Sequence, residues 1–159
     1  MLMVYEISEA GTVNAPIDPQ NKLIQEALAK VKEHYQKEGF KRPWVSFLAF
    51  EKGPCVGYCG FKSAPKEDGR LEIFFYPFPG KESAIVATDM VRRLVEMTNF
   101  HDKKAIVTFC TSSSDDQTAK ILKSLEFTVK GPLDTPQGQV WEWNFGWKGH
   151  VRFEHIAKN

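Results

Sequence analysis

Residues 71–96 constrain this chain most, because they predict an apolar strand, a short loop and then a helix packed by one face. The first part, LEIFFYPFP, is apolar and aromatic, whereas AIVATDMVRRLVE has apolar residues at helical spacing. The loop between them, GKESA at residues 80–84, is expected to present backbone N–H groups at the start of the helix. Those N–H groups and the aligned peptide dipoles favour a bound anion such as a phosphate. The alternative is an ordinary connection closed by water or side chains.

Length and charge restrict the class of protein. A chain of 159 residues has the usual length of one domain, so we expect a single domain over residues 1–159. Lys and Arg number 21 and Asp and Glu number 20, which gives a net charge of +1. This balance argues against a broad phosphate-binding surface, so no nucleic-acid partner is expected.

Three cysteines, Cys55, Cys59 and Cys110, indicate the compartment and the absence of a zinc site. Their number is odd and their spacing matches no zinc motif, so a reducing, cytoplasmic location is the simpler interpretation and no metal is expected. No stretch reaches the ~20 apolar residues of a membrane span, and the first residues contain no basic segment followed by a long apolar run. We therefore expect no membrane partner.

The first third of the chain predicts a strand and a helix. Residues 2–8 are expected to form the strand, and Asp18 followed by Pro19 offers a helix N-cap with proline at the first helical position. The helix should run to Glu38, with Gly39 closing it in a left-handed conformation. Its apolar positions recur at helical spacing; they are Leu23, Ile24, Ala27, Leu28, Val31 and Tyr35.

A hairpin follows, with strands at residues 44–50 and 55–62 on either side of the turn EKGP. Gly57 and Gly60 lie inside the second strand. They indicate a close backbone approach or a bulge, although glycine in an edge strand would look the same.

Residues 105–111 are expected to form a buried strand parallel to residues 71–76, because a helix of crossover length connects the two. Ser114 and Gln117 form a capping box for the next helix, whose buried face should be Ile121, Leu122 and Leu125. Residues 127–131 and 139–145 predict the last hairpin, across a loop rich in Pro, Asp and Gly. Residues 146–159 receive no assignment.

Three blocks of this sequence, in the same order, resemble one family. Residues 72–79, EIFFYPFP, with Ala87-Thr88, resemble the cofactor-binding segment of the GNAT superfamily of acyl-CoA-dependent N-acetyltransferases. The RimJ/RimL-like branch is most similar, because its helix pattern E-N-x-x-S-x-x-x-L-E-K-L-G-F matches residues 114–127 without a gap. Its closing strand D-G-x-V-W-x-W matches residues 138–143, GQVWEW.

The resemblance implies the GNAT acyl-CoA N-acyltransferase fold, a mixed α/β (α+β) fold. Its sheet is mostly antiparallel, with a parallel central strand pair and helices on both faces. The implied reaction is aminolysis of acetyl-CoA by a primary amine, which needs a base, N–H groups for the developing oxyanion and a pyrophosphate site. The acceptor is an amine-bearing small molecule or a protein N-terminus, and the protein is a monomer or a homodimer.

Glu72 lies at the glutamate position of the family motif and is the candidate base, acting through a water. The alternative is a solvated or ion-paired strand residue. The resemblance places the cofactor against the end of the strand, the loop and the first turn of the helix. The implied binding residues are Phe75, Tyr76, Lys81, Glu82, Ser83, Ala84, Ile85, Val86, Ala87, Thr88 and Asp115.

Some of these residues have a second interpretation. Phe75 and Tyr76 offer backbone to the pantetheine arm, whereas their side chains suit the core and a cleft wall. Asp115 stands at the family's asparagine position, where it lacks the amide donor and is also a candidate helix cap. Leu122 stands where many members place a tyrosine acid, so no proton donor for the leaving thiolate is visible.

The phosphate loop departs from the family pattern R/Q-x-x-G-x-G/A, which falls on residues 82–87, where only Ala87 fits. Ile85 adds bulk where glycine lets backbone approach the pyrophosphate, and Glu82 introduces negative charge. Pro77 removes an N–H from the strand, whereas Lys81 supplies compensating charge. Two hypotheses follow: an acetyl-CoA-dependent N-acetyltransferase, or a catalytically degenerate GNAT-fold binding and interaction module.

Overall fold

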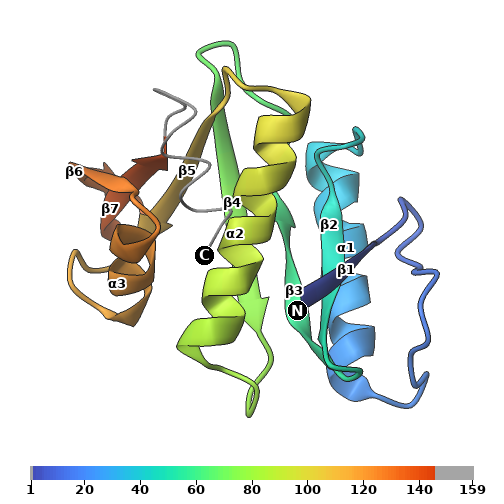
Figure 1. Ribbon diagram of the computed structural model, residues 1–159. Coiled ribbons are helices and arrows are strands. Elements are labelled where there is room, and N and C mark those ends of the chain that lie inside the picture. The colour runs from blue at the N-terminus through green and yellow to red at the C-terminus, as the bar shows by residue number, and fades with distance from the viewer. Residues whose placement is uncertain (1, 146–159) are drawn as a thin grey trace. The chain divides into compact units, whose positions relative to one another are not determined.

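A computed structural model describes residues 2–145, which contain three helices and seven strands (Figure 1). The strands follow the order β1-β2-β3-β4-β5-β7-β6 in one sheet. The pairs β1–β2, β2–β3, β5–β7 and β6–β7 are antiparallel, and β4–β5 is parallel. The predicted mixed, mostly antiparallel fold with one parallel pair is therefore confirmed. The elements are β1 (Leu2–Glu6), α1 (Lys22–Glu38), β2 (Ser46–Glu51), β3 (Cys55–Phe61), β4 (Arg70–Pro77), α2 (Ala84–His101), β5 (Ile106–Thr111), α3 (Gln117–Ser124), β6 (Thr128–Thr135) and β7 (Gly138–Phe145).

Contacts divide the chain into two compact units. The first unit comprises residues Met1–Ala64 and Phe74–Met90, and the second comprises Pro65–Ile73 and Val91–Asn159. Both β4 and α2 therefore have residues in each unit. That residues 1–159 form one domain stays a prediction.

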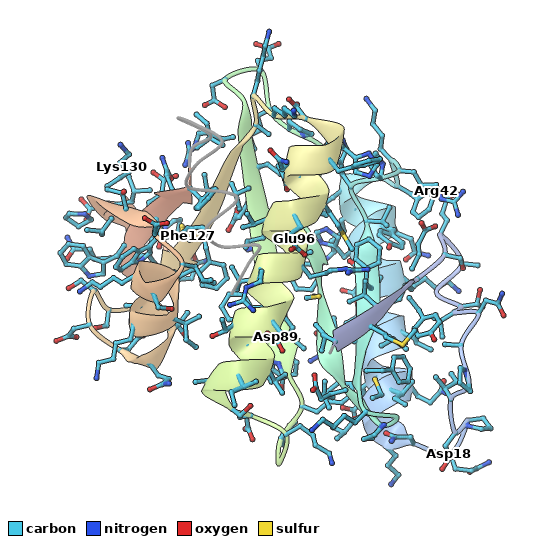
Figure 2. All side chains as sticks on the ribbon, in the orientation of Figure 1. Asp18, Arg42, Asp89, Glu96, Phe127 and Lys130 are labelled. Carbon is cyan, nitrogen blue, oxygen red and sulfur yellow. The ribbon has the colours of Figure 1, made fainter. Side chains whose placement is uncertain are left out.

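The helix α1 of the first unit begins later than its sequence predicted. Asn21, not Asp18, is the N-cap, and its side chain accepts the N–H of Ile24 at 3.1 Å. Asp18 lies in the loop that leads into α1 (Figure 2) and accepts the N–H two residues on, at 2.9 Å. Because this local turn already uses the Asp18 carboxylate, the chain after Pro19 stays outside the helix until Lys22.

The end and the buried face of α1 agree with the prediction. The helix ends at Glu38, and Gly39 has a positive φ of 93°, although its ψ of 169° is not the left-handed helical value. The Tyr35 hydroxyl donates to the Ile7 carbonyl and accepts the Ser46 N–H, each at 2.9 Å, so it joins α1 to the sheet. Burial raises the pKa of Tyr35, and the hydrogen bond that its hydroxyl accepts from the Ser46 backbone opposes that rise. Of the predicted apolar positions, only Leu23 is exposed.

The two strand glycines of β3 permit close backbone approach. A Cβ on Gly57 would clash with the carbonyl oxygen of Tyr76 and lie 2.8 Å from Pro77 Cα. A Cβ on Gly60 would lie 2.6 Å from the carbonyl oxygen of Val45. The β2–β3 register also shifts between Ala49 and Phe50. The sequence left close approach and a bulge as alternatives, and the structure has both.

In the first unit, α1 and the start of α2 cover opposite faces of the strands (Figure 1). A Cβ on Gly57 would lie 2.9 Å from the Met90 side chain of α2. The next residue, Tyr58, lines a pocket together with Val31 of α1. Because successive strand residues point to opposite faces, the two helices lie on different faces of this part of the sheet.

The second unit contains the parallel strand pair. Residues 70–72 of β4 pair with residues 106–108 of β5. The Trp143 ring of β7 is 1% exposed, and its Nε1–H donates to Thr111 Oγ1 at 2.9 Å. Arg70 of β4 forms an ion pair with the buried Glu142 of β7.

The cap of α3 differs from the predicted capping box. Asp116, not Ser114, is the N-cap and accepts the N–H of Ala119 at 2.8 Å. Ser113 and Asp115 are hydrogen-bonded to each other at 2.6 Å, and the backbone at Asp116 is extended, so the helix begins only at Gln117. The predicted buried face is confirmed: Ile121, Leu122 and Leu125 are all buried.

The last hairpin has longer strands than predicted. Pairing of β6 with β7 continues to Thr135 opposite Gly138, so the expected long loop is a two-residue turn. The pairing also contains a register shift between Val129 and Gly131. The unassigned tail, residues 146–159, lies outside the described residues.

Glu126, immediately after α3, has a φ of +67° and stands where the family pattern places glycine. A left-handed conformation costs a residue with a Cβ roughly 1–2 kcal/mol. Glu126→Gly is therefore expected to raise the melting temperature by about 2–8 °C in thermal unfolding. Glu126→Ala is the control, because it removes the same side chain but keeps the Cβ. Equal melting temperatures for the two variants would contradict the strain at this position.

Candidate functional site

Ser83 organises the start of α2 in the first unit. Its Oγ accepts the N–H of Val86 at 3.0 Å, and its carbonyl accepts the N–H of Ala87 at 3.1 Å. Ser83 thus acts as the N-cap, a role that its short hydroxyl side chain suits. Two N–H groups of the predicted phosphate site are therefore already hydrogen-bonded within the chain.

The loop before α2 holds a carboxylate of its own. Glu82 accepts the N–H of Gly80 at 2.7 Å, and the Gly80 backbone has a φ of +84°. The Lys81 N–H donates to the Phe78 carbonyl at 2.8 Å and closes the turn. An N–H group of this loop therefore already has an anion as its partner.

The N–H groups of Ala84 and Ile85 have no acceptor within the described residues 2–145. They belong to the first turn of α2, where a helix offers unsatisfied donors and the positive end of its dipole. The Ile85 side chain is 71% exposed and Lys81 is also exposed, whereas Thr88 is half-buried. The first turn of α2 thus retains two donors for an anion, with a lysine in the preceding loop.

The end of β4 leads into this loop. Tyr76 is 45% exposed, and its ring meets that of Tyr58 edge to face with the centroids 5.4 Å apart. Phe75 is half-buried, and Pro77, still within β4, has no N–H to donate. The Phe78 N–H donates to the Val56 carbonyl at 2.8 Å. The Tyr76 side chain therefore joins a surface of aromatic rings, in line with the second interpretation of this residue.

A pocket of about 360 Å³ lies in the first unit, against α1. Lys30, Val31, His34 and Glu38 line it from the helix. Positions 30, 34 and 38 repeat every four residues, so they share one side of α1 beside its apolar face. The sequence analysis used only the apolar positions of this helix and missed these three polar residues. Their four-residue spacing was the signal that could have identified them.

The other side of the pocket comes from the sheet. Ser46 of β2, Tyr58 of β3 and Phe74 of β4 line it, together with Lys62, which follows β3. His34 Nε2 lies 2.6 Å from the Lys62 carbonyl oxygen, and because a carbonyl only accepts, Nε2 must donate. In the neutral ring Nδ1 then remains an acceptor. Burial raises the pKa of Tyr58, so its hydroxyl stays protonated.

Glu72 and Asp115 belong to the second unit, whereas residues 75–88 belong to the first. Glu72 is half-buried on β4, in register with Thr108 of β5. Asp115 is exposed and is bonded to Ser113, so it is not the helix cap. Leu122 is fully buried in α3, and its side chain has no acidic group that could donate a proton.

The described residues contain no group of three or more His, Cys, Asp or Glu side chains placed to hold a metal ion. Among the helices of residues 2–145, none has both the length and the apolar character that a membrane span requires.

Comparison with solved structures identifies the fold. A spermidine N-acetyltransferase chimera of Vibrio cholerae SpeG and hSSAT superposes with a TM-score of 0.68 at 9% identity, over 99% of both chains. The aminoglycoside acetyltransferase AAC(6')-Ib, in complex with coenzyme A, superposes with a TM-score of 0.66 at 18% sequence identity, over 99% of both chains. Arabidopsis thaliana Naa50, in complex with a bisubstrate analogue, superposes with a TM-score of 0.57 at 13% sequence identity, over 91% of this chain and 98% of the Naa50 chain.

No protein-family model matches the sequence. No curated protein matches it either. The described chain therefore has the GNAT fold of these acetyltransferases at sequence identities that show the fold alone.

Proposed function

We propose that this protein transfers an acetyl group from acetyl-CoA to the primary amine of a small molecule or a protein N-terminus. The observation that carries the proposal is a fold shared with N-acetyltransferases over nearly the whole chain. The sequence blocks at residues 72–79, 114–127 and 138–143 favour the RimJ/RimL-like branch within that fold. Several of the similar structures were solved with coenzyme A or acetyl-CoA, which supports acetyl-CoA as the donor.

The first turn of α2 is the proposed site for the pyrophosphate of acetyl-CoA. The Ala84 and Ile85 N–H groups lie at the positive end of the helix dipole, and Lys81 adds a cation in the preceding loop. Glu82 opposes this, because its carboxylate bonds the Gly80 N–H and would repel a phosphate. We therefore expect the Glu82 side chain to leave Gly80 when the cofactor binds.

Acetyl-CoA, when bound, supplies the activated thioester carbonyl. The residues of the chain must then orient the amine and accept its proton. Glu72 is the proposed general base, acting through a water, because it is a half-buried carboxylate on the central strand. Position 122 supplies no proton to the leaving group, because it is a buried leucine.

The Glu82–Gly80 hydrogen bond also favours a second candidate, a binding module that has lost catalysis. A loop whose own carboxylate bonds its N–H group is expected to bind an external phosphate more weakly, because the two anions compete. The two candidates differ in their affinity for acetyl-CoA, which calorimetry on the purified protein measures.

Glu82→Gln is expected to tighten acetyl-CoA binding by about five- to ten-fold, because it removes the competing negative charge. Lys81→Ala should weaken binding by a similar factor. Lys103→Ala, an exposed lysine after α2 in the second unit, is the matched control and should leave the affinity unchanged. If the native protein fails to bind acetyl-CoA at millimolar concentration and Glu82→Gln restores binding, the degenerate module is the correct candidate. Tight binding that neither Lys81→Ala nor Glu82→Gln alters would place the phosphate site elsewhere.

A further inference from the structure

The pocket between α1 and the sheet of the first unit has the size of a ligand site. Its volume of about 360 Å³ lies at the lower end of the range for small-molecule sites, roughly 300–1,000 Å³. This volume suits a molecule of metabolite size.

Ser46 supplies a buried polar group without a hydrogen bond. It is 0% exposed and lines the pocket, and its Oγ has no hydrogen-bond partner. The nearby Tyr35 hydroxyl is engaged by the Ile7 carbonyl and the Ser46 N–H. Buried hydroxyl groups in folded proteins nearly always have a partner, so a polar ligand group in the pocket would meet an unused donor and acceptor.

An aromatic wall lies beside Ser46. The Tyr58 ring meets Phe74 and Tyr76 edge to face, with centroids 5.7 Å and 5.4 Å away, and Phe78 follows at 6.3 Å. Tyr58 and Phe74 line the pocket directly, and Val31 adds an aliphatic surface from α1. Such a wall favours a ligand with an aromatic or apolar body. It also connects the pocket to the end of β4 that precedes the loop of residues 80–84.

The charged side chains of the pocket are of both signs. Lys30 and Lys62 contribute two ammonium groups against the single carboxylate of Glu38. Neither Lys30 nor Glu38 forms an ion pair with another described residue, and both are exposed on α1, about 12 Å apart along its axis. A polyamine would bring several positive charges beside Lys30, against the single carboxylate that Glu38 gives the lining. An amine that also carries a carboxylate can pair with both signs.

We propose that this pocket binds the acceptor, and that the acceptor is a small amino-carboxylate with an aromatic or apolar body rather than a polyamine. The carboxylate faces Lys30, the amine lies toward Glu38, and the body contacts Tyr58 and Phe74. This inference rests on the proposed acetylation only in naming the ligand as the acceptor; its binding does not depend on acetyl-CoA.

Calorimetry without acetyl-CoA tests the proposal with four probes: L-phenylalanine, phenethylamine, 3-phenylpropionate and spermidine. We expect L-phenylalanine to bind about three- to ten-fold more tightly than the two probes that lack one charged group, and spermidine to bind most weakly. If spermidine binds most tightly, or if L-phenylalanine does not bind at millimolar concentration, the proposal is wrong.

Two variants locate the binding. Lys30→Gln should weaken the binding of L-phenylalanine and 3-phenylpropionate about three- to ten-fold and leave the affinity for phenethylamine unchanged. The control is Lys32→Gln, the same substitution about 200° around the helix, which should leave the affinities for all the probes unchanged. Ser46→Ala should weaken the binding of L-phenylalanine by a similar factor. The melting temperature of this variant should equal or exceed the native value, because a buried polar atom without a partner is removed. Native affinity for L-phenylalanine in both Lys30→Gln and Ser46→Ala would overturn the proposal.

A separate titration with acetyl-CoA distinguishes this inference from the proposed function. Binding of acetyl-CoA without binding of L-phenylalanine refutes the pocket proposal and leaves the proposed reaction standing. Binding of L-phenylalanine without acetyl-CoA supports the pocket as a ligand site and refutes the proposed acetylation.

Discussion

Glu72→Gln is expected to lower the turnover of amine acetylation by ~10²–10⁴, the usual contribution of a general base. Glutamine keeps the shape of the half-buried side chain on β4 but cannot accept the amine proton. Steady-state kinetics with a saturating amine measure the loss in kcat. Because the proposed pyrophosphate site lies at the start of α2, acetyl-CoA affinity should stay nearly native, and calorimetry checks this.

Glu67→Gln is the matched control, because Glu67 is an exposed carboxylate in the connection before β4. It removes the same charge from the same unit and should leave kcat unchanged. If Glu72→Gln retains native turnover, Glu72 has no role as a base. If Glu67→Gln loses as much turnover as Glu72→Gln, the effect reflects net charge rather than proton transfer.

Gly57→Ala is expected to produce the largest loss of stability, about 3 kcal/mol, at the upper end of the usual cost of overpacking. The added Cβ would clash with the Tyr76 carbonyl oxygen, lie 2.8 Å from Pro77 Cα and lie 2.9 Å from the Met90 side chain. Two of these neighbours are backbone atoms and cannot rotate away. Thermal unfolding should therefore show a melting temperature lower by roughly 6–12 °C.

Gly53→Ala is the control for this loss, because it lies in the β2–β3 turn with open space around it. Its φ of +113° predicts a smaller cost, about 1 kcal/mol, from backbone conformation alone. Equal losses for the two variants would show that β3 does not approach the end of β4 as closely as the structure has it.

Most elements were predictable because their signals are local. The apolar spacing in residues 22–38 indicates a helix packed by one face, and Gly39 marks its end correctly. The parallel pairing of β4 with β5 followed from the length of the intervening helix, and the register confirms it.

The helix caps were not predictable from residue type. Asp18 and Asn21 are both good caps, as are Ser114 and Asp116, and the sequence analysis chose the wrong member of each pair. The choice depends on which residue has an extended backbone when the helix docks. At Asp18 the carboxylate is already used by a local turn, which the sequence does not reveal.

By itself, the sequence determined the order of strands and helices and the loop of residues 80–84 before α2. These depend on hydrophobic periodicity and on motifs of neighbouring residues, which need no knowledge of distant contacts. The hydrogen bond of Glu82 to the Gly80 N–H is local, between residues two apart in this loop. Only the tertiary structure decided that Lys30, Ser46 and Tyr58 line one pocket. In the sequence Ser46 is one polar residue beside an apolar run. Its hydroxyl becomes a buried group without a partner only when α1 packs on β2 and Tyr35 bonds the Ser46 N–H, because contacts between distant segments determine which polar groups remain unsatisfied.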